Sequence, residues 1–165
     1  MDKQTVFHVL EPIYDTHSKI LLLGSMPSPK SRETGFYYGH PQNRFWRVLS
    51  DVLGETLPLT NDEKKKLLAN NNIALWDVLA SCQITGADDN SIRNPIPNNI
   101  GKILSVAPIR AIFTTGGAAA RFYQKLCYPH TKREAIRLPS TSPANCRLSY
   151  DKLKEAYHII LDYLT

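Results

Sequence analysis

Short apolar runs alternate along the chain with amphipathic stretches of ten or so residues. An apolar run of four to six residues that is bounded by turn residues is typical of a buried β-strand. Four such runs predict strands, at Lys19–Leu23, Asn72–Trp76, Arg110–Thr115 and Glu134–Leu138.

The amphipathic stretches predict helices. In Asn43–Leu53, the apolar residues recur with the spacing of one helical face, and Gly54 follows as a helix terminator. Thr60 and Glu63 form a capping-box pattern for a second helix that ends near Ala69. Two later helices are expected to bury residues at helical spacing: Ala119, Phe122, Tyr123 and Leu126 after Gly116-Gly117, and Tyr150, Leu153, Tyr157, Ile160, Leu161 and Leu164 after a Ser149 cap.

This alternation predicts an α/β fold, with a mostly parallel sheet covered by helices on both faces. No repeat or linker-like segment interrupts the chain, so we expect one domain over residues 1–165. Ligands of such sheets bind outside the carboxyl ends of the strands. The loops 24–42, 77–97 and 139–148 each follow a predicted strand, so we expect them to form one composite site.

Composition narrows the class of protein. The chain has 165 residues, a hydrophobic content of 42% and a net charge of +5, which is compatible with a polyanionic partner. No apolar run approaches a membrane span or the core of a secretory signal, so we expect a cytoplasmic protein. The three cysteines and five histidines show no ligand spacing, and we therefore expect no metal, no cofactor and no disulfide framework.

The first loop carries the least ordinary sequence, GFYYGHPQNRFW at residues 35–46. A ring such as Tyr38 could stack on a planar ligand or pack in the core. Asn43 could hold a polar ligand group or only cap the helix that follows, and His40 is open to the same two interpretations. Gly24, at a strand end, permits close backbone approach or an ordinary tight turn.

The other two loops offer polar groups. Asp77 follows the second strand directly and could be a helix cap or a catalytic carboxylate, whereas Asp88-Asp89-Asn90 is typical of a solvated turn. The segment Ser140-Thr141-Ser142-Pro143-Ala144-Asn145 could grip phosphate oxygens or cap the last helix.

Together, these segments resemble the uracil-DNA glycosylase superfamily. GSMPSPKSRETGFYYGHPQNRFW is similar to its first motif and LPSTSPAN to its second. The YY-x-HP-x-N-x-FW form, ALWDVLASC and NPIPN resemble the hypoxanthine-DNA glycosylase branch, also called DNA-deoxyinosine glycosylase. The resemblance implies a three-layer fold with a four-stranded parallel sheet, and an enzyme that flips a damaged base out of DNA and hydrolyses its N-glycosidic bond without a metal.

The resemblance also assigns residues. It implies Asn43 as the catalytic residue and Tyr38, twelve residues after Met26, as the ring that stacks on the flipped base. Backbone groups of Gly24, Ser25 and Met26 are expected to line the base pocket together with His40 and Asp77. DNA phosphates are expected near Ser140, Ser142, Pro143, Asn145 and Arg147.

Four positions depart from the family pattern, of which Ser28, where the branch has a glycine, is a minor difference. Met26 stands where most relatives carry a water-activating Asp or Asn, and a methionine cannot orient water by hydrogen bonding. Ser140 replaces the usual His or Asn. Ala144 replaces the leucine that wedges into the DNA stack, leaving Asn145, Arg147 or Leu148 to fill the gap.

We therefore expect a monomeric, monofunctional DNA glycosylase that releases hypoxanthine from deoxyinosine. The alternatives are a uracil- or mismatch-directed glycosylase of the same fold, a nucleic-acid-binding module without catalysis, and a nucleoside hydrolase. The last would require two placed carboxylates, and the sequence nominates only Asp77.

Overall fold

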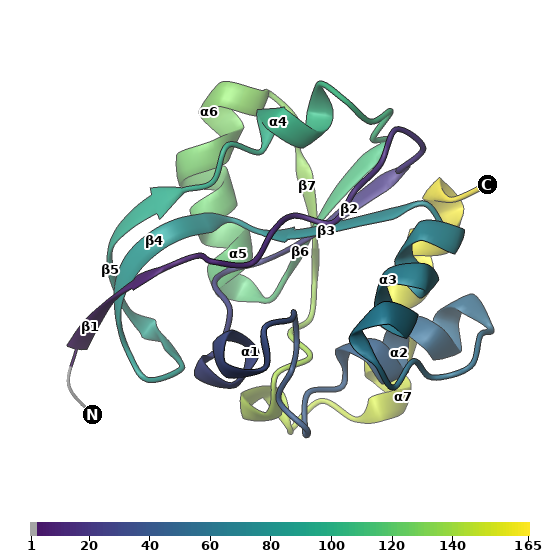
Figure 1. Cartoon of the computed structure of the whole chain (residues 1–165), viewed down its shortest axis with the longest axis horizontal. Coiled ribbons are helices and arrows are strands. Elements are labelled where there is room, and N and C mark those ends of the chain that lie inside the picture. Colours follow the sequence, from purple (N-terminus) through teal and green to yellow (C-terminus); the bar gives the residue numbers. More distant parts are fainter. Residues whose placement is uncertain (1–2) are drawn as a thin grey trace.

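The computed structural model describes residues 3–165 and is built around a four-stranded parallel sheet (Figure 1). The strand order is β3-β2-β6-β7. The strands are β2 (Ile20–Gly24), β3 (Ile73–Asp77), β6 (Ala111–Thr115) and β7 (Ala135–Leu138). Every residue of β2 and β3 is buried, as expected for parallel strands covered on both faces. The four predicted strands are therefore confirmed, with small shifts at their ends.

Helices form the two outer layers (Figure 1). On one side lie α2 (Phe45–Leu53), α3 (Asn61–Asn70) and α7 (Tyr150–Tyr157), and on the other α4 (Gly101–Leu104), α5 (Gly117–Phe122) and α6 (Tyr128–Thr131). The predicted terminators and caps are present. Gly54 ends α2 with φ +70°, and the Thr60 and Ser149 hydroxyls accept from backbone N–H groups in the first turns of α3 and α7.

The helices differ from expectation in detail. Helix α2 begins at Phe45, not at Asn43. Between α5 and α6 the chain widens into a π-helical segment, Tyr123–Cys127. The last helix tightens into a 3₁₀ segment at His158–Tyr163. Of the residues expected to be buried in this helix, Tyr150, Leu161 and Leu164 are only partly buried.

A second, antiparallel sheet of order β1-β4-β5 was not predicted. It consists of β1 (Lys3–Phe7), β4 (Leu79–Thr85) and β5 (Asp88–Pro97). The expectation that residues 77–97 form a loop is therefore wrong: they form a hairpin that turns at Gly86, where φ is +60°. Polar residues on the exposed face and several register shifts hid these strands from the apolar-run criterion.

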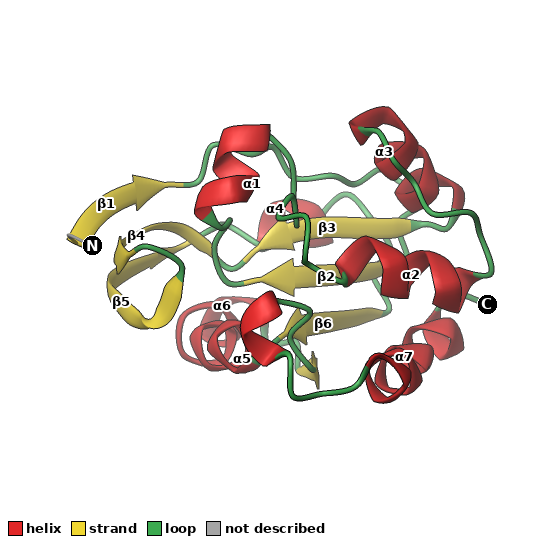
Figure 2. Cartoon of the chain, turned by 90° about the horizontal axis from the view of Figure 1, so that it is seen from below, coloured by secondary structure: helices red, strands yellow, loops and turns green. Residues whose placement is uncertain are grey.

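The first loop also contains a short helix, α1 (Pro29–Thr34), which Ser28 caps and Gly35 ends with φ +76°. Figure 2 shows the arrowheads of β2 and β3 directed toward α1 and the antiparallel sheet. The carboxyl edge of the parallel sheet is thus enclosed by α1, the β4–β5 hairpin and the segment before α7. No helix of the described residues is long and apolar enough to cross a membrane.

Candidate active site

A cavity of about 300 Å³ lies at the carboxyl edge of the parallel sheet. Most of the predicted site residues line it: Gly24, Ser25, Met26, Tyr38, His40, Asn43, Asp77, Ser140, Ser142 and Pro143. Asn145 instead lines a hollow beside this cavity, and Arg147 is exposed and lines neither. The fold therefore brings three distant segments of the chain together around one cavity. The volume of this cavity is at the lower end of the range that is usual for ligand sites.

Tyr38 forms one wall of the cavity in a strained conformation. Its φ of +53° lies in the left-handed region, which is rare for a bulky residue and costs roughly 1–3 kcal/mol. The ring stacks on Phe45 with a centroid separation of 3.9 Å and an interplanar angle of 12°. Its hydroxyl lies 3.1 Å from Thr115 Oγ1. Both ends of the side chain are thus fixed, and burial together with the charge of Asp77 raises the pKa of its hydroxyl.

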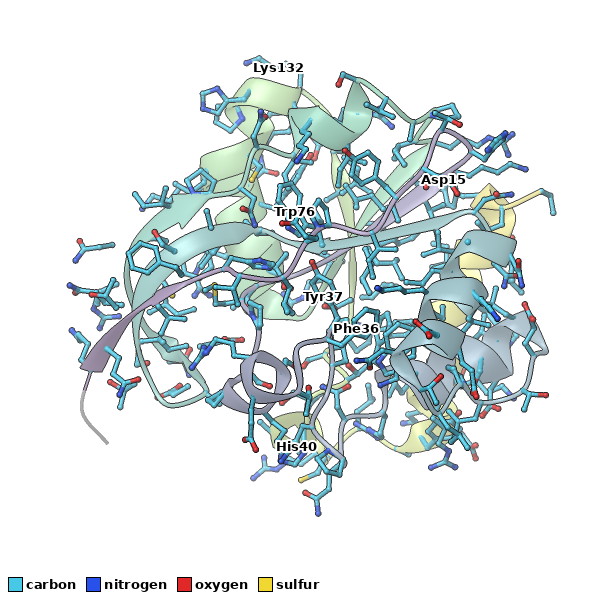
Figure 3. The ribbon with its side chains drawn as sticks, viewed as in Figure 1. Asp15, Phe36, Tyr37, His40, Trp76 and Lys132 are labelled. Atoms are coloured by element: carbon cyan, nitrogen blue, oxygen red, sulfur yellow. The ribbon has the colours of Figure 1, made fainter. Side chains whose placement is uncertain are left out.

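The other rings of the first motif are structural. Phe36, Tyr37, Phe45 and Trp46 are buried, and Figure 3 shows Phe36 and Tyr37 in the interior of the molecule between Trp76 and His40. The Tyr37 hydroxyl donates to the Glu11 carbonyl at 2.7 Å, and the Trp46 indole N–H donates to the Tyr37 carbonyl at 3.0 Å. Tyr37 also lines the cavity but is only 2% exposed, whereas Tyr38 is partly exposed there and stacks on Phe45.

Asn43 caps the helix that follows, and its amide nitrogen is left over at the cavity. Its Oδ1 accepts from the Phe45 backbone N–H at 2.9 Å, at the start of α2, and from Thr141 Oγ1 at 2.8 Å. Both acceptor directions of the amide oxygen are therefore occupied. The Nδ2 group has no hydrogen-bond partner among residues 3–165, and the residue lines the cavity. The side chain thus presents a donor to a ligand.

His40 offers a second donor. Its Nδ1 accepts from the Gln42 backbone N–H at 3.0 Å, and this bond assigns the ring proton of the neutral form to Nε2. The His40 carbonyl accepts from the Asn43 N–H at 2.9 Å, so the turn that presents the imidazole also fixes the start of the Asn43 segment.

Asp77 lies at the end of β3, opposite Gly24 in the parallel register. A β-carbon at position 24 would collide with Asp77 Oδ1 and come within 3.1 Å of the Tyr38 hydroxyl, so the close approach requires glycine there. The second carboxylate oxygen, Oδ2, lies 2.9 Å from His8 Nε2.

The second motif forms a stiff rim. Ser140 Oγ accepts from the Ser142 N–H at 3.1 Å, and Ser142 Oγ accepts from the Ala144 N–H at 3.2 Å. Each hydroxyl therefore keeps its own proton for another acceptor. Arg44 ties the rim to α2, because its guanidinium donates to the carbonyls of Leu148 at 2.7 Å and Asn145 at 3.0 Å.

Four residues at the site were not singled out as site residues from the sequence. Thr115 ends a parallel strand and Thr141 lies inside the second motif, so the strand-end rule and the motif could have identified them. His8 has no such signal, because only the folded path of β1 brings it to Asp77. Asp89 was expected in a solvated turn, but it is the second residue of the hairpin strand β5, accepts from Ser25 Oγ at 3.2 Å and lines the cavity.

Asp89 is the second carboxylate at this cavity. Desolvation there raises the pKa of its carboxyl, and the charges of Asp88 and Asp77 act in the same direction, although much of the residue remains open to solvent. The hydrogen bond from Ser25 opposes this shift.

Comparison with known proteins decides the family. The model of the uracil DNA glycosylase superfamily matches residues 11–164. The chain belongs to this superfamily. The resemblance of its two motifs is thereby confirmed, and so is the predicted fold class.

Individual relatives extend this finding. A curated protein of Methanosarcina acetivorans named Hypoxanthine DNA glycosylase is 33% identical over 144 residues, which are 87% of this chain and 90% of the relative. A protein of the same name from Methanosarcina barkeri is 33% identical over 137 residues, or 82% and 86% of the two chains. The solution NMR structure of a Methanosarcina acetivorans protein, provisionally named a uracil DNA glycosylase, superposes with a TM-score of 0.83 and 29% identity, over 98% of this chain and 99% of that one.

Proposed function

We propose that this protein is a monofunctional DNA glycosylase, acting as a single domain, that hydrolyses the N-glycosidic bond of a flipped deaminated base. The substrate we propose is hypoxanthine in deoxyinosine, as in the names of the two Methanosarcina relatives. The observation that carries the proposal is the fixed carboxamide of Asn43, whose oxygen is held twice and whose N–H donors remain free at a cavity sized for one heterocycle.

The flipped base enters the cavity and stacks on Tyr38, opposite the segment 140–144. Stacking on one aromatic ring contributes roughly 1–3 kcal/mol per base, and Tyr38 needs no reorganisation because Phe45 backs it. The carbonyls of Gly24 and Ser25 already accept from the Val78 and Leu79 N–H groups at 2.8 and 3.1 Å. These two carbonyls are therefore occupied, and the backbone groups that remain for the base are the N–H groups of Ser25 and Met26.

Bond cleavage builds positive charge on the sugar and negative charge on the departing base. Donors fixed before the reaction stabilise that negative charge without reorganisation. Asn43 Nδ2 supplies such a donor, and His40 Nε2 supplies another at the same cavity. Water then attacks C1′, the C–N bond breaks with its electron pair leaving on the base, and the base takes up a proton.

The DNA backbone lies along the rim. The hydroxyl oxygens of Ser140 and Ser142 accept backbone N–H groups, and neither hydroxyl donates to a residue from 3 to 165. Their protons are therefore available to phosphate oxygens. Ala144 offers only a methyl group as a wedge, so the enzyme depends on bases that already pair weakly.

The test is base release from three labelled duplexes, which contain deoxyinosine, deoxyuridine opposite guanine, or no lesion, with EDTA present. Free hypoxanthine from the first duplex alone supports the proposal and metal-independent chemistry. Release of uracil alone would favour the uracil-directed alternative. Binding of the lesion without release from any duplex would favour a non-catalytic module, and activity on free nucleosides alone would favour a hydrolase.

A further inference from the structure

Asp89 lies where the cavity opens into a wider hollow of about 700 Å³. Among residues 3–165, both spaces are lined by Ala87, Asp89, Ser140, Ser142 and Ala144. Asp89 is the ionisable residue of this set. It belongs to the β4–β5 hairpin, whereas the last three residues belong to the second motif, so the hairpin and the motif together form the opening.

The position of the sugar in this opening follows from its covalent bonds. C1′ carries the base, and the same sugar is joined to the backbone phosphates. With the base stacked on Tyr38 inside the cavity and the phosphates at the Ser140 and Ser142 hydroxyls, the sugar lies at the junction of the two spaces. Asp89 lines this junction and is therefore close to C1′.

The water that attacks C1′ must lose a proton, so it needs an acceptor beside that carbon. Other side-chain acceptors of the cavity are already engaged. Asn43 Oδ1 accepts two hydrogen bonds, and His40 Nδ1 accepts one from a backbone N–H. The Asp77 carboxylate contacts His8, and its side chain is only 5% exposed. Asp89, by contrast, is exposed and within reach of water.

The Asp89 carboxylate is held at one oxygen and open at the other. Oδ1 accepts from Ser25 Oγ at 3.2 Å, and Oδ2 makes no hydrogen bond to any residue from 3 to 165. The turn around it is fixed as well. Asp88 Oδ1 accepts from the Asn90 N–H at 3.0 Å, and Ser91 Oγ donates to the Asp88 carbonyl at 2.6 Å. The chain thus presents Oδ2 as an oriented acceptor at the opening.

We propose that Asp89 is a catalytic residue whose Oδ2 binds the attacking water and takes a proton from it, and that Ser25 is the positioning residue that orients the carboxylate. The inference rests on the proposed function, because it assigns the water-binding group of that same site. The water oxygen bonds to C1′ while the C–N bond breaks and its electron pair leaves on the base. The proton passes from water to Oδ2 and then to solvent, and the base takes up a proton. The negative charge of Asp89 also stabilises the positive charge that builds on the sugar.

The proposed role predicts an acid limb in the rate, because only the ionised carboxylate can accept the proton. Desolvation raises the pKa of Asp89, the charges of Asp88 and Asp77 raise it further, and the bond from Ser25 and the charge of Arg121 oppose the shift. A raised pKa makes the carboxylate a stronger base. The rate should therefore fall as the pH drops through the folded-state pKa of Asp89.

The experiment measures single-turnover base release against pH, from deoxyinosine and deoxyuridine duplexes, together with duplex affinity by fluorescence anisotropy. Asp89→Asn keeps an acceptor for Ser25 Oγ and should lower the rate near pH 7 on the order of a hundredfold. It should bind the duplex at least as tightly as wild type, because it removes a negative charge beside the phosphates. Asp89→Glu restores a carboxylate and should recover part of the rate.

The pH profile separates Asp89 from other groups of the site. The His40 imidazole also lines the cavity, so the acid limb is assigned to Asp89 by its absence from Asp89→Asn. Ser25→Ala keeps the backbone N–H but removes the bond that lowers the pKa of Asp89. Its acid limb should move to higher pH, which a purely structural serine would not cause.

The neighbouring residue Asp88 provides a matched control. It lines the hollow and is not among the residues 3–165 that line the cavity. Asp88→Asn makes the same chemical change and keeps an acceptor for the Asn90 N–H. It should retain the wild-type rate near pH 7. Thermal melting of each variant at each pH separates loss of fold from loss of chemistry.

Three outcomes overturn the inference: a wild-type rate in Asp89→Asn, equal losses of rate in Asp89→Asn and Asp88→Asn, or a loss of rate in Asp89→Asn that an equal loss of duplex affinity explains. Wild type that releases uracil but not hypoxanthine contradicts only the proposed substrate, and the same variants then test Asp89 on the deoxyuridine duplex. Wild type that releases neither base refutes the proposed function and the inference together.

Discussion

Thr141 Oγ1 donates a hydrogen bond to Asn43 Oδ1 at 2.8 Å and so joins the two sequence motifs, which lie 98 residues apart. Thr141 is buried, and its own carbonyl accepts from the Arg44 N–H at 3.1 Å. The second motif therefore does more than line the rim, because it fixes the rotation of the carboxamide that we propose as the catalytic group.

This contact predicts the effect of Thr141→Val. The substitution removes one of the two bonds to Asn43 Oδ1 but leaves the bond from the Phe45 N–H. The loss is about 1 kcal/mol, so single-turnover base release should fall about fivefold. Thr141→Ser keeps the hydroxyl and serves as the control. Equal rates in wild type and Thr141→Val would show that the amide needs no second anchor.

Substitutions at Asn43 separate its structural role from its chemical role. Asn43→Ala should abolish base release and cost about 1 kcal/mol of stability through the lost cap. Asn43→Asp keeps an acceptor for the Phe45 N–H and the Thr141 hydroxyl but removes the Nδ2 donors. It should therefore be at least as stable as Asn43→Ala and still inactive. Substantial turnover by Asn43→Asp would exclude the amide N–H as the essential group.

The parallel sheet could be predicted from sequence because its evidence is local. A run such as Ile20–Gly24 is buried at every position, so its apolar composition already marks it as a strand. The strand-end rule then locates the cavity, since Gly24 and Asp77 end neighbouring strands of the same sheet. The motifs supply the rest of the predicted lining.

The contacts that tune the site could not be predicted in this way. His8 reaches Asp77 only because β1 pairs with β4, and neither strand has an apolar run. Asp89 reaches Ser25 only because residues 77–97 fold back as a hairpin. In both cases the residue lies in a polar, half-exposed segment, and its role depends on pairing between distant strands that local composition does not encode.

Tyr38 should distinguish damaged from undamaged DNA. Tyr38→Ala removes the stacking surface, which is worth roughly 1–3 kcal/mol, and should weaken binding of a deoxyinosine duplex far more than binding of an undamaged duplex. Tyr38→Phe keeps the ring on Phe45, loses only the contact with Thr115, and serves as the control. Fluorescence anisotropy with both duplexes measures the two affinities, and equal losses on both would make the ring structural.

Asp89 should make the stability of the fold depend on pH. Desolvation raises its pKa in the folded state above that of the unfolded chain, so ionising the carboxyl costs more free energy in the folded protein. The ionised group therefore costs stability at neutral pH, and this cost disappears as the pH falls through the folded-state pKa. Asp89→Asn removes the ionisation but keeps an acceptor for Ser25. Its melting temperature should exceed that of wild type near pH 7, and the difference should shrink toward about pH 4, the ordinary range of a carboxyl. A difference that stays constant over this range would contradict the assignment of the raised pKa to Asp89.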